Sequence, residues 1–323
     1  MNIREISRLC GVSVCTTSRI LSGQSKKYRI CEATANRVRK AAKKLGYRPN
    51  YLAHSLNKGQ THTIGLIMAN TVDLYLGSIM EGVEDRLRST EYRMVVATCE
   101  NSLDLQDREI ERMLYRQVDG IILYPKAIPA TQSYRLPVPL NTVRKLTPFV
   151  IVGRNLPGKY NEVMTADVEA GQAAAAYLAD RGGTHFGMIA PAEECSSTLA
   201  RRRGFLQELK RRGVPEQQVF YWRADRKLDK KNARLITACD AIFGINSNCL
   251  LKVLESLPPA DPRKFKLASV GLVEGQSLLN LDLRTWLLPG RQMGHLAAEM
   301  LLKHIADPGQ PLRHVELPLL IRG

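Results

Sequence analysis

The chain has 323 residues, of which 44% are hydrophobic and 24% are charged, so it is long enough for two or three globular domains. It has no run of about 18 apolar residues and no apolar segment near its charged N-terminus, so we expect neither a membrane span nor a secretory signal, and we expect a cytoplasmic location. Seven scattered cysteines without a CxxC pair suit a reducing compartment. No metal site and no cofactor site is predicted.

The positive charge is concentrated at the N-terminus. Residues 1–60 hold 13 Lys or Arg and two acidic residues, which is +11 of the total charge of +16. A small basic head on a mildly basic body is typical of nucleic-acid binding. A solvated basic surface would explain one run of charges, but it does not explain two-thirds of the excess in a fifth of the chain.

The head is predicted to contain a helix-turn-helix. Helices are expected over residues 3–10, 14–21 and 32–45. Ile3, Ile6 and Leu9 recur at helical spacing, Gly11 stands where a left-handed helix end belongs, and Ser13 stands where the second helix needs a cap. Two short helices joined by such a turn also occur in structural proteins, so this pattern alone is moderately specific.

In a helix-turn-helix the second helix enters the major groove of DNA. The residues expected to contact DNA from this helix are Val14, Cys15, Thr16, Ser18 and Arg19. Arg19 is predicted to bond a guanine edge with two donors, and Thr16 and Ser18 to reach phosphates.

A hinge is predicted after the head. Pro49 stands at a helix start, and Leu52 and Leu56 share one face of a segment of about eight residues. A helix this short is marginal in water, so it should form only when it is supported. A plain linker, which is the alternative, would need neither leucine.

The body alternates predicted strands and helices from residue 63 onward. Strands are expected at 63–68, 93–98, 119–124, 149–153, 185–190, 219–222, 241–245, 266–271 and 285–288. Helices are expected at about 74–90, 103–117, 168–180, 197–212, 247–256 and 291–306. This alternation predicts doubly wound parallel sheets. There is no HExxH, GxSxG or P-loop motif, so an enzyme is not expected.

Several motifs resemble the lactose-repressor (LacI/GalR) family of transcription factors. They are "IREISRLCGVSVCTTSRIL", "GYRPN", "LAHSL" and "TIGLIM", and "SGQSKKYRICEAT" more narrowly resembles the fructose and sucrose repressors. The resemblance implies a helix-turn-helix domain (1–47), a hinge (48–61) and a periplasmic-binding-protein-like effector and dimerisation domain (62–323). Its subdomains would span about 62–157, with part of 289–323, and 158–288. Cys31 departs from the family, which usually has a serine there as a cap for the third helix.

The resemblance also implies site residues and partners. Further DNA contacts would be Tyr47, Asn50 and Leu56, with Leu56 as a wedge in the minor groove. Effector contacts would be Asp73, Tyr75, Arg154, Arg201 and Asn246. The implied protein is a repressor that binds an approximately palindromic operator as a homodimer, with a sugar or sugar phosphate as effector. Family tetramers often use an added C-terminal helix, and because this sequence stops at "ELPLLIRG" we expect a dimer.

The cleft departs from the family pattern at several positions. Gly153 and Ser247 stand where aspartates are frequent, and "GLVEG" replaces the usual "GFDD". A cleft with fewer carboxylates that keeps Arg154 and Arg201 favours an anionic ligand such as a sugar phosphate. A constitutive regulator with a ligand-blind cleft would look the same. A sugar-binding transport component is a third alternative, which the basic head disfavours.

Overall fold

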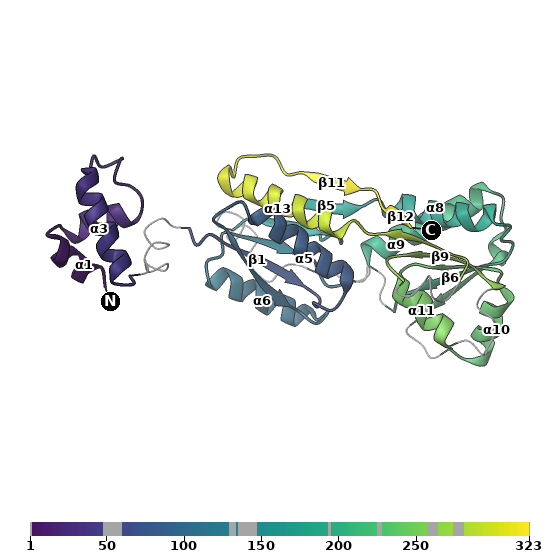
Figure 1. Cartoon of the computed structure of the whole chain (residues 1–323). Helices are drawn as coiled ribbons and strands as arrows, with labels where there is room; N and C mark the ends of the chain where they lie inside the picture. The colour runs from purple at the N-terminus through teal and green to yellow at the C-terminus, as the bar shows by residue number, and fades with distance from the viewer. Residues whose placement is uncertain are drawn as a thin grey trace. The chain divides into compact units, whose positions relative to one another are not determined.

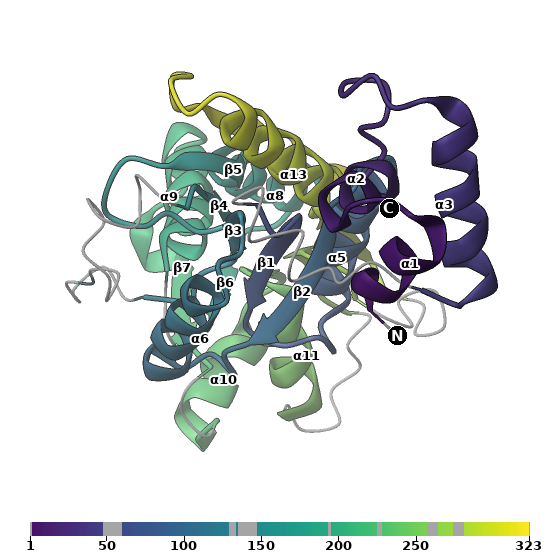
Figure 2. The same ribbon diagram turned by 90° about the vertical axis from the view of Figure 1, so that its left-hand side faces the viewer.

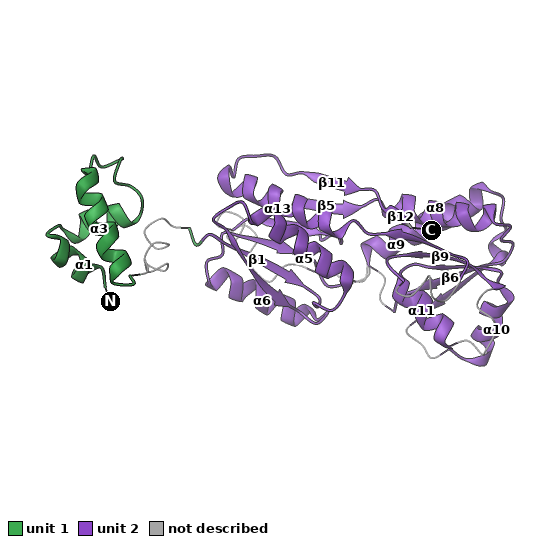
Figure 3. Cartoon of the chain, viewed as in Figure 1, with its two compact units in different colours: residues 1–61 green, residues 62–323 purple. Residues whose placement is uncertain are grey.

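The computed structural model describes residues 2–47, 60–128, 134, 147–192, 195–224, 228–256, 264–273 and 281–322. The chain separates into two compact units, Met1–Thr61 and His62–Gly323 (Figure 3). The predicted hinge helix, with Asn50 and Leu56, lies outside the described residues.

The first unit has the three predicted helices. They are α1 (Ile3–Cys10), α2 (Val14–Leu21) and α3 (Glu32–Lys44). Asn2 caps α1 in a capping box with Glu5, and Gly11 ends the helix at φ 59°. The Ser13 side chain accepts a hydrogen bond from the Thr16 amide and so begins α2. The turn between α1 and α2 is therefore confirmed, with Gly11 and Ser13 in the roles predicted from the sequence.

The three helices of the first unit pack against one another (Figure 2), and a small apolar core joins them. Ile6, Ile20 and Val38 are at most 1% exposed, and the Ser7 hydroxyl donates to Thr17 Oγ1 at 2.9 Å inside the contact between α1 and α2. Cys31 begins α3 without a side-chain cap, as the missing serine predicts. This core fixes α2 while leaving its outer face free.

The second unit contains two sheets, each with six strands among the described residues. The first has the order β11-β5-β4-β3-β1-β2, and all its pairings are parallel. Its strands are β1 (Thr63–Met68), β2 (Arg93–Thr98), β3 (Gly120–Leu123), β4 (Phe149–Val152), β5 (Asn161–Thr165) and β11 (His314–Leu317).

The second sheet has the order β12-β10-β9-β8-β6-β7, and only the pairing of β12 with β10 is antiparallel among its described strands. Its strands are β6 (Phe186–Ala190), β7 (Val219–Arg223), β8 (Ala241–Gly244), β9 (Lys266–Val270), β10 (Leu283–Leu287) and β12 (Leu320–Arg322).

Helices cover both faces of each sheet, which confirms the doubly wound body (Figure 1). The first sheet carries α5 (Leu74–Leu87) and α13 (Gly290–Ala306) on one face and α6 (Leu103–Tyr115) on the other. The second carries α8 (Asp167–Asp180) and α9 (Ser196–Arg211) on one face, and α10 (Lys230–Ala238) and α11 (Ser247–Ser256) on the other. A 3-10 helix, η1 (Glu216–Gln218), precedes β7.

Besides η1, four elements were not predicted, and one of them moves a boundary. These are β5, β11, β12 and α10. Strand β5 pairs with β4 and β11, so the first subdomain continues to Thr165 and the predicted boundary between 157 and 158 is too early. The C-terminal part of the chain serves both sheets, because β11 joins the first and β12 joins the second. In the described parts of the chain, no helix has the length and apolarity that a membrane span requires.

Candidate functional site

The outer face of α2 is the first candidate site. Val14 is 43% exposed, and Cys15 and Ser18 are exposed as well. The Arg19 guanidinium lies 3.9 Å from the centre of the Tyr28 ring, and this stacking leaves the edge of the guanidinium available for hydrogen bonds. Tyr28 was not predicted, because it follows α2 in a turn and no helical spacing connects it with Arg19.

Two other predicted DNA contacts, Thr16 and Tyr47, are only partly exposed. Thr16 is half-buried, and its hydroxyl lies 2.8 Å from Ser13 Oγ, so it also supports the start of α2. Tyr47 is half-buried and packs against the core of the first unit. A contact of Tyr47 with DNA would therefore be made by an exposed part of this side chain.

The second candidate site is a cavity of about 480 Å³ in the second unit. It lies beyond the carboxyl ends of strands from both sheets, where ligands bind in open α/β sheets. All five residues that the resemblance singled out line it, namely Asp73, Tyr75, Arg154, Arg201 and Asn246. Other lining residues that the argument below uses are Tyr124, Cys195, Ser197 and Thr198.

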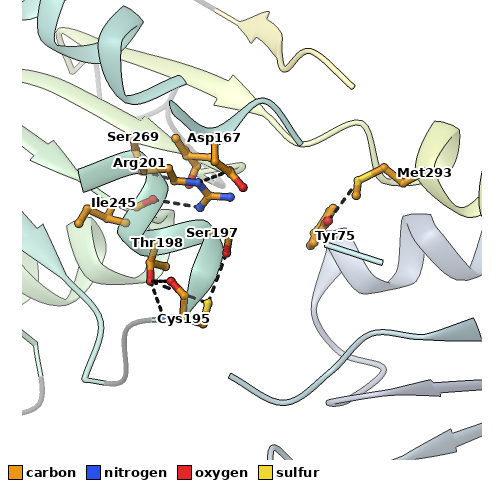
Figure 4. A network of polar contacts seen from close by, with 10 residues as sticks. Tyr75, Asp167, Cys195, Ser197, Thr198, Arg201, Ile245, Ser269 and Met293 are labelled. Carbon is orange, nitrogen blue, oxygen red and sulfur yellow. Dashed lines mark hydrogen bonds and ion pairs between the residues drawn. The ribbon is translucent and has the colours of Figure 1, made fainter. Parts of the chain in front are cut away.

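Arg201 is held by a carboxylate that the sequence reasoning missed. Its Nε donates to Asp167 Oδ1 at 2.7 Å and its Nη1 donates to the Ile245 carbonyl at 3.1 Å (Figure 4). Burial raises the pKa of the Asp167 carboxyl, and the guanidinium opposes that rise. Gly171 brings the two helices together, because a Cβ there would lie 2.0 Å from the Arg201 carbonyl oxygen. The sequence pattern kept Arg201 as a cation for an anionic ligand and did not reveal that Asp167 neutralises its charge.

Arg154 is held by an aromatic ring and a backbone carbonyl, whereas Arg201 is held by a carboxylate. Its guanidinium lies 4.6 Å from the centre of the Tyr124 ring, and its Nη1 donates to the Pro125 carbonyl at 2.7 Å. Its Nε is buried and has no hydrogen-bond partner. No carboxylate of the described residues forms an ion pair with Arg154, so these residues leave its positive charge without a neutralising partner.

Two tyrosines meet beside Arg154 at the position where the family often has an aspartate. The rings of Tyr75 and Tyr124 contact each other edge to face at 5.9 Å. Gly153 has φ +75°, and a Cβ there would lie 2.7 Å from the Tyr124 ring and 3.1 Å from the Tyr75 hydroxyl. Burial raises the pKa of both phenols, so they stay neutral and can donate hydrogen bonds. With glycine at position 153 in place of the frequent aspartate, the two tyrosine rings line this part of the cavity and position 153 supplies no carboxylate to it.

Asp73 and Asn246 each begin a helix as well as line the cavity. Asp73 Oδ1 accepts from the Tyr75 amide at 2.9 Å at the start of α5, and Asn246 Oδ1 accepts from the Cys249 amide at 2.8 Å at the start of α11. Each side chain keeps one further polar atom for another contact.

Comparison with known proteins assigns the chain to a family. Residues 2–50 match the model of bacterial regulatory proteins of the lacI family, and residues 61–237 match that of periplasmic binding proteins and the sugar binding domain of the LacI family. The chain belongs to the LacI family. Residues 175–323 also match a periplasmic binding protein-like domain. The LacI-family resemblance is thereby confirmed, and the chain is a DNA-binding transcriptional regulator.

Curated LacI-family relatives align over most of the chain. The regulator PtxS of Pseudomonas putida is 28% identical and the ribose operon repressor of Escherichia coli is 24% identical; these alignments cover 100% and 99% of this chain, and 95% and 98% of the relatives. The fructose operon regulatory protein of Vibrio cholerae is 24% identical over 84% of both chains.

Solved structures of LacI-family regulators share the fold. A regulator from Silicibacter pomeroyi has a TM-score of 0.73 at 22% identity, covering 100% of this chain and 98% of that one. The Cra regulator of Pseudomonas putida, solved in complex with fructose 1-phosphate, has a TM-score of 0.67 at 19% identity, covering 81% and 98%.

Proposed function

We propose that this LacI-family regulator is a repressor that binds its operator through the outer face of α2 and that a small sugar or sugar derivative in the cavity controls this binding. One observation carries the proposal. The same chain presents a helix-turn-helix with Arg19 stacked on Tyr28 and a separate cavity lined by all five positions that match family effector contacts. Control of one site by the other needs an effector that binds two states of the protein with different affinities.

The charges around the cavity indicate which chemical groups a ligand should carry. Asp167 neutralises Arg201, so Arg154 is the cation that remains for a ligand among the described lining residues. Buried tyrosine hydroxyls and the amide of Asn246 add neutral polar groups. This set suits a sugar that gives Arg154 a hydroxyl or an anionic group, and it supplies one free positive charge to a phosphate, where the sequence alone suggested two.

The proposal is tested by measuring operator affinity against a panel of sugars. An operator selected from random DNA is titrated with the full chain, alone and with neutral sugars, sugar acids and sugar phosphates. We expect at least one compound to change the affinity by about 5- to 150-fold. If none does, the alternative of a constitutive regulator whose cleft binds no effector replaces this proposal.

Arg154→Gln should keep operator binding and lose the response to the effector. The matched control is Arg181→Gln, because Arg181 is exposed and paired with Asp282 outside the cavity. An Arg154→Gln protein that responds like the wild type would remove Arg154 from the effector site. Arg201→Ala is a poorer test, because it leaves the Asp167 carboxylate buried without its partner.

The proposed regulator acts in the cytoplasm as a homodimer. A two-fold protein demands an approximate palindrome, with half-sites spaced to fit its two recognition helices. Sedimentation of the full chain and footprinting on the selected operator check both points. A monomer that protects one unrepeated site would contradict the dimer.

A further inference from the structure

Cys195 lies in the wall of the effector cavity at the N-terminus of α9. It is the residue that precedes this 16-residue helix, and it is 4% exposed. Its Sγ lies 3.3 Å from Ser197 Oγ and 3.8 Å from Thr198 Oγ1, both on the first turn of α9 (Figure 4). Hydroxyl donors and the positive end of a helix dipole both stabilise a thiolate at this position.

A second, independent feature of the same cavity points to an anionic or polar group beside this thiol. Arg154 lines the cavity, and its buried Nε has no hydrogen-bond partner. Burial raises the pKa of the Cys195 thiol, but the charge of Arg154 and the hydrogen bonds from Ser197 and Thr198 outweigh it, so the pKa lies below its ordinary value.

The three other buried thiols of the second unit provide the contrast. Burial raises the pKa of Cys239 to about 11 and that of Cys249 to about 12, and it raises the pKa of Cys99 as well. Cys239 and Cys99 do not line the effector cavity, and neither does Cys249. A low pKa and access to a cavity therefore coincide at Cys195 among these four thiols.

We propose that Cys195 is a modification site at which a small peroxide that enters the effector cavity oxidises the thiolate to a sulfenic acid. The sulfur attacks one peroxide oxygen, an S–O bond forms and the O–O bond breaks. The sulfur loses two electrons, and the second oxygen leaves as hydroxide, which takes up a proton and becomes water. Ser197 and the guanidinium of Arg154 both line the cavity and can stabilise the charge that develops on that oxygen.

The position of the thiol determines what can react with it. A cavity of about 480 Å³ admits hydrogen peroxide, whereas the slight exposure of Cys195 keeps the thiols of other proteins away. A sulfenic oxygen would lie in the same cavity as Arg154 and compete for the guanidinium that we assign to the effector. This consequence depends on the proposed function, but the reactivity of the thiol does not.

The first experiment maps sulfenic acid in the native full chain. The protein is treated with hydrogen peroxide in the presence of dimedone, and labelled peptides are quantified by mass spectrometry. We expect Cys195 to be labelled at least about tenfold faster than Cys249, because a much larger fraction of it is thiolate. Labelling of Cys195 as slow as that of Cys249 would overturn the proposal. Cys195→Ser, which keeps a capping side chain, confirms the assignment of the peptide.

The second experiment measures the role of Arg154 through the charge of the reagent. Rates of alkylation by anionic iodoacetate and neutral iodoacetamide are compared at Cys195 and in N-acetylcysteine. We expect the ratio of the two rates to be about tenfold higher at Cys195, and Arg154→Gln to remove this preference while Arg154→Lys keeps it. An equal ratio at Cys195 and in N-acetylcysteine would overturn the proposed pairing even if a variant failed to fold. Neither experiment uses DNA or an effector, so their failure is distinct from failure of the proposed function.

Discussion

Three arginines at family positions differ in what holds them, and this difference sets what each can do. Arg19 stacks on Tyr28 at a surface, Arg201 is buried in an ion pair with Asp167, and Arg154 lies over Tyr124 with a free donor. From the sequence, Arg19 was predicted to contact DNA, and Arg154 and Arg201 were predicted to contact the effector. Their partners show that the second is part of the fold, and they support our proposals that the first contacts DNA and the third contacts a ligand.

Arg19→Ala should lower the discrimination between operator and random DNA by about 1–3 kcal/mol at one base position, because a two-donor contact to guanine is lost. Binding to a set of single-base operator variants measures this. The control is Lys26→Ala, an exposed residue near α2 that should weaken all sequences alike if it meets phosphate. Equal losses on operator and random DNA for Arg19→Ala would remove Arg19 from base recognition.

Asp167→Ala should lower the free energy of unfolding by about 3–5 kcal/mol, because it leaves the Arg201 charge buried without a partner. The matched control is Asp180→Ala at the other end of α8. Asp180 is 65% exposed and pairs with Arg212, so about 0–1 kcal/mol is expected. Urea unfolding of the three proteins decides this, and similar losses in both variants would contradict the buried pairing.

The sequence predicted which residues line the cavity, but it did not predict which groups neutralise or contact them. Matching to the family located the five lining residues, whereas Asp167, Tyr124 and Cys195 were missed. Asp167 reaches Arg201 from another helix, 34 residues away in the chain, and only the close contact of α8 and α9 at Gly171 creates the pair. Such long-range partners leave no periodic signal.

Helices and strands, too, were predicted only where the sequence carries a clear apolar pattern. The nine predicted strands are present with ends shifted by at most two residues, because buried parallel strands are short continuous apolar runs. Strand β5 ("NEVMT") and strand β11 ("HVEL") carry polar residues and lack that signal. Helix α10 buries one residue, Ile236, so its apolar face was too narrow to recognise.

The pairing of β11 with β5 should depend on pH through His314. Its Nδ1 lies 2.8 Å from Glu162, and this hydrogen bond raises the pKa of His314 above its ordinary value of 6.5. A histidine with a raised pKa in the folded protein contributes stability that is complete below 6.5 and is lost as the pH rises through the folded value. The free energy of unfolding should therefore fall as the pH rises above 6.5 and through the raised pKa of His314.

His314→Gln should flatten this part of the pH profile, with a small effect, because the imidazole is 47% exposed. Urea unfolding at pH 5.5 and 8.5 measures the difference between the two proteins. His295→Gln, at an exposed position on α13, is the control and should keep the wild-type slope. An unchanged slope in His314→Gln would show that Glu162 does not hold the imidazolium.

At the scale of the whole second unit, the described chain crosses between the two sheets three times. It passes from β5 to α8, from β10 to α13 and from β11 to β12. Each crossing is a few residues long and all three connect the same two layers, which is the arrangement for closure of one subdomain on the other around a ligand. A ligand that bridges Tyr75 and Arg154 on one side and Asn246 on the other would favour the closed form.

The final prediction concerns the hinge, whose residues lie outside the described structure. Leu56→Ala should lower operator affinity sharply, because two leucines from a dimer would be inserted into an opened minor groove, and a helix of about eight residues would fold only there. Non-specific binding should keep its dependence on salt, because no charge is removed. The operator centre should contain a flexible pyrimidine–purine step such as CG.

Binding to operator and to random DNA over a range of salt concentrations separates these effects, with Lys58→Ala as the contrasting variant. Lys58→Ala should reduce the salt dependence by about one phosphate contact if it meets the backbone, while bending of the operator persists. Leu56→Ala should do the reverse, with an unchanged salt dependence and lost bending. Because a dimer would place one wedge from each protomer at the centre, footprints should be two-fold symmetric. A Leu56→Ala protein that bends and protects the operator as the wild type does would refute the wedge.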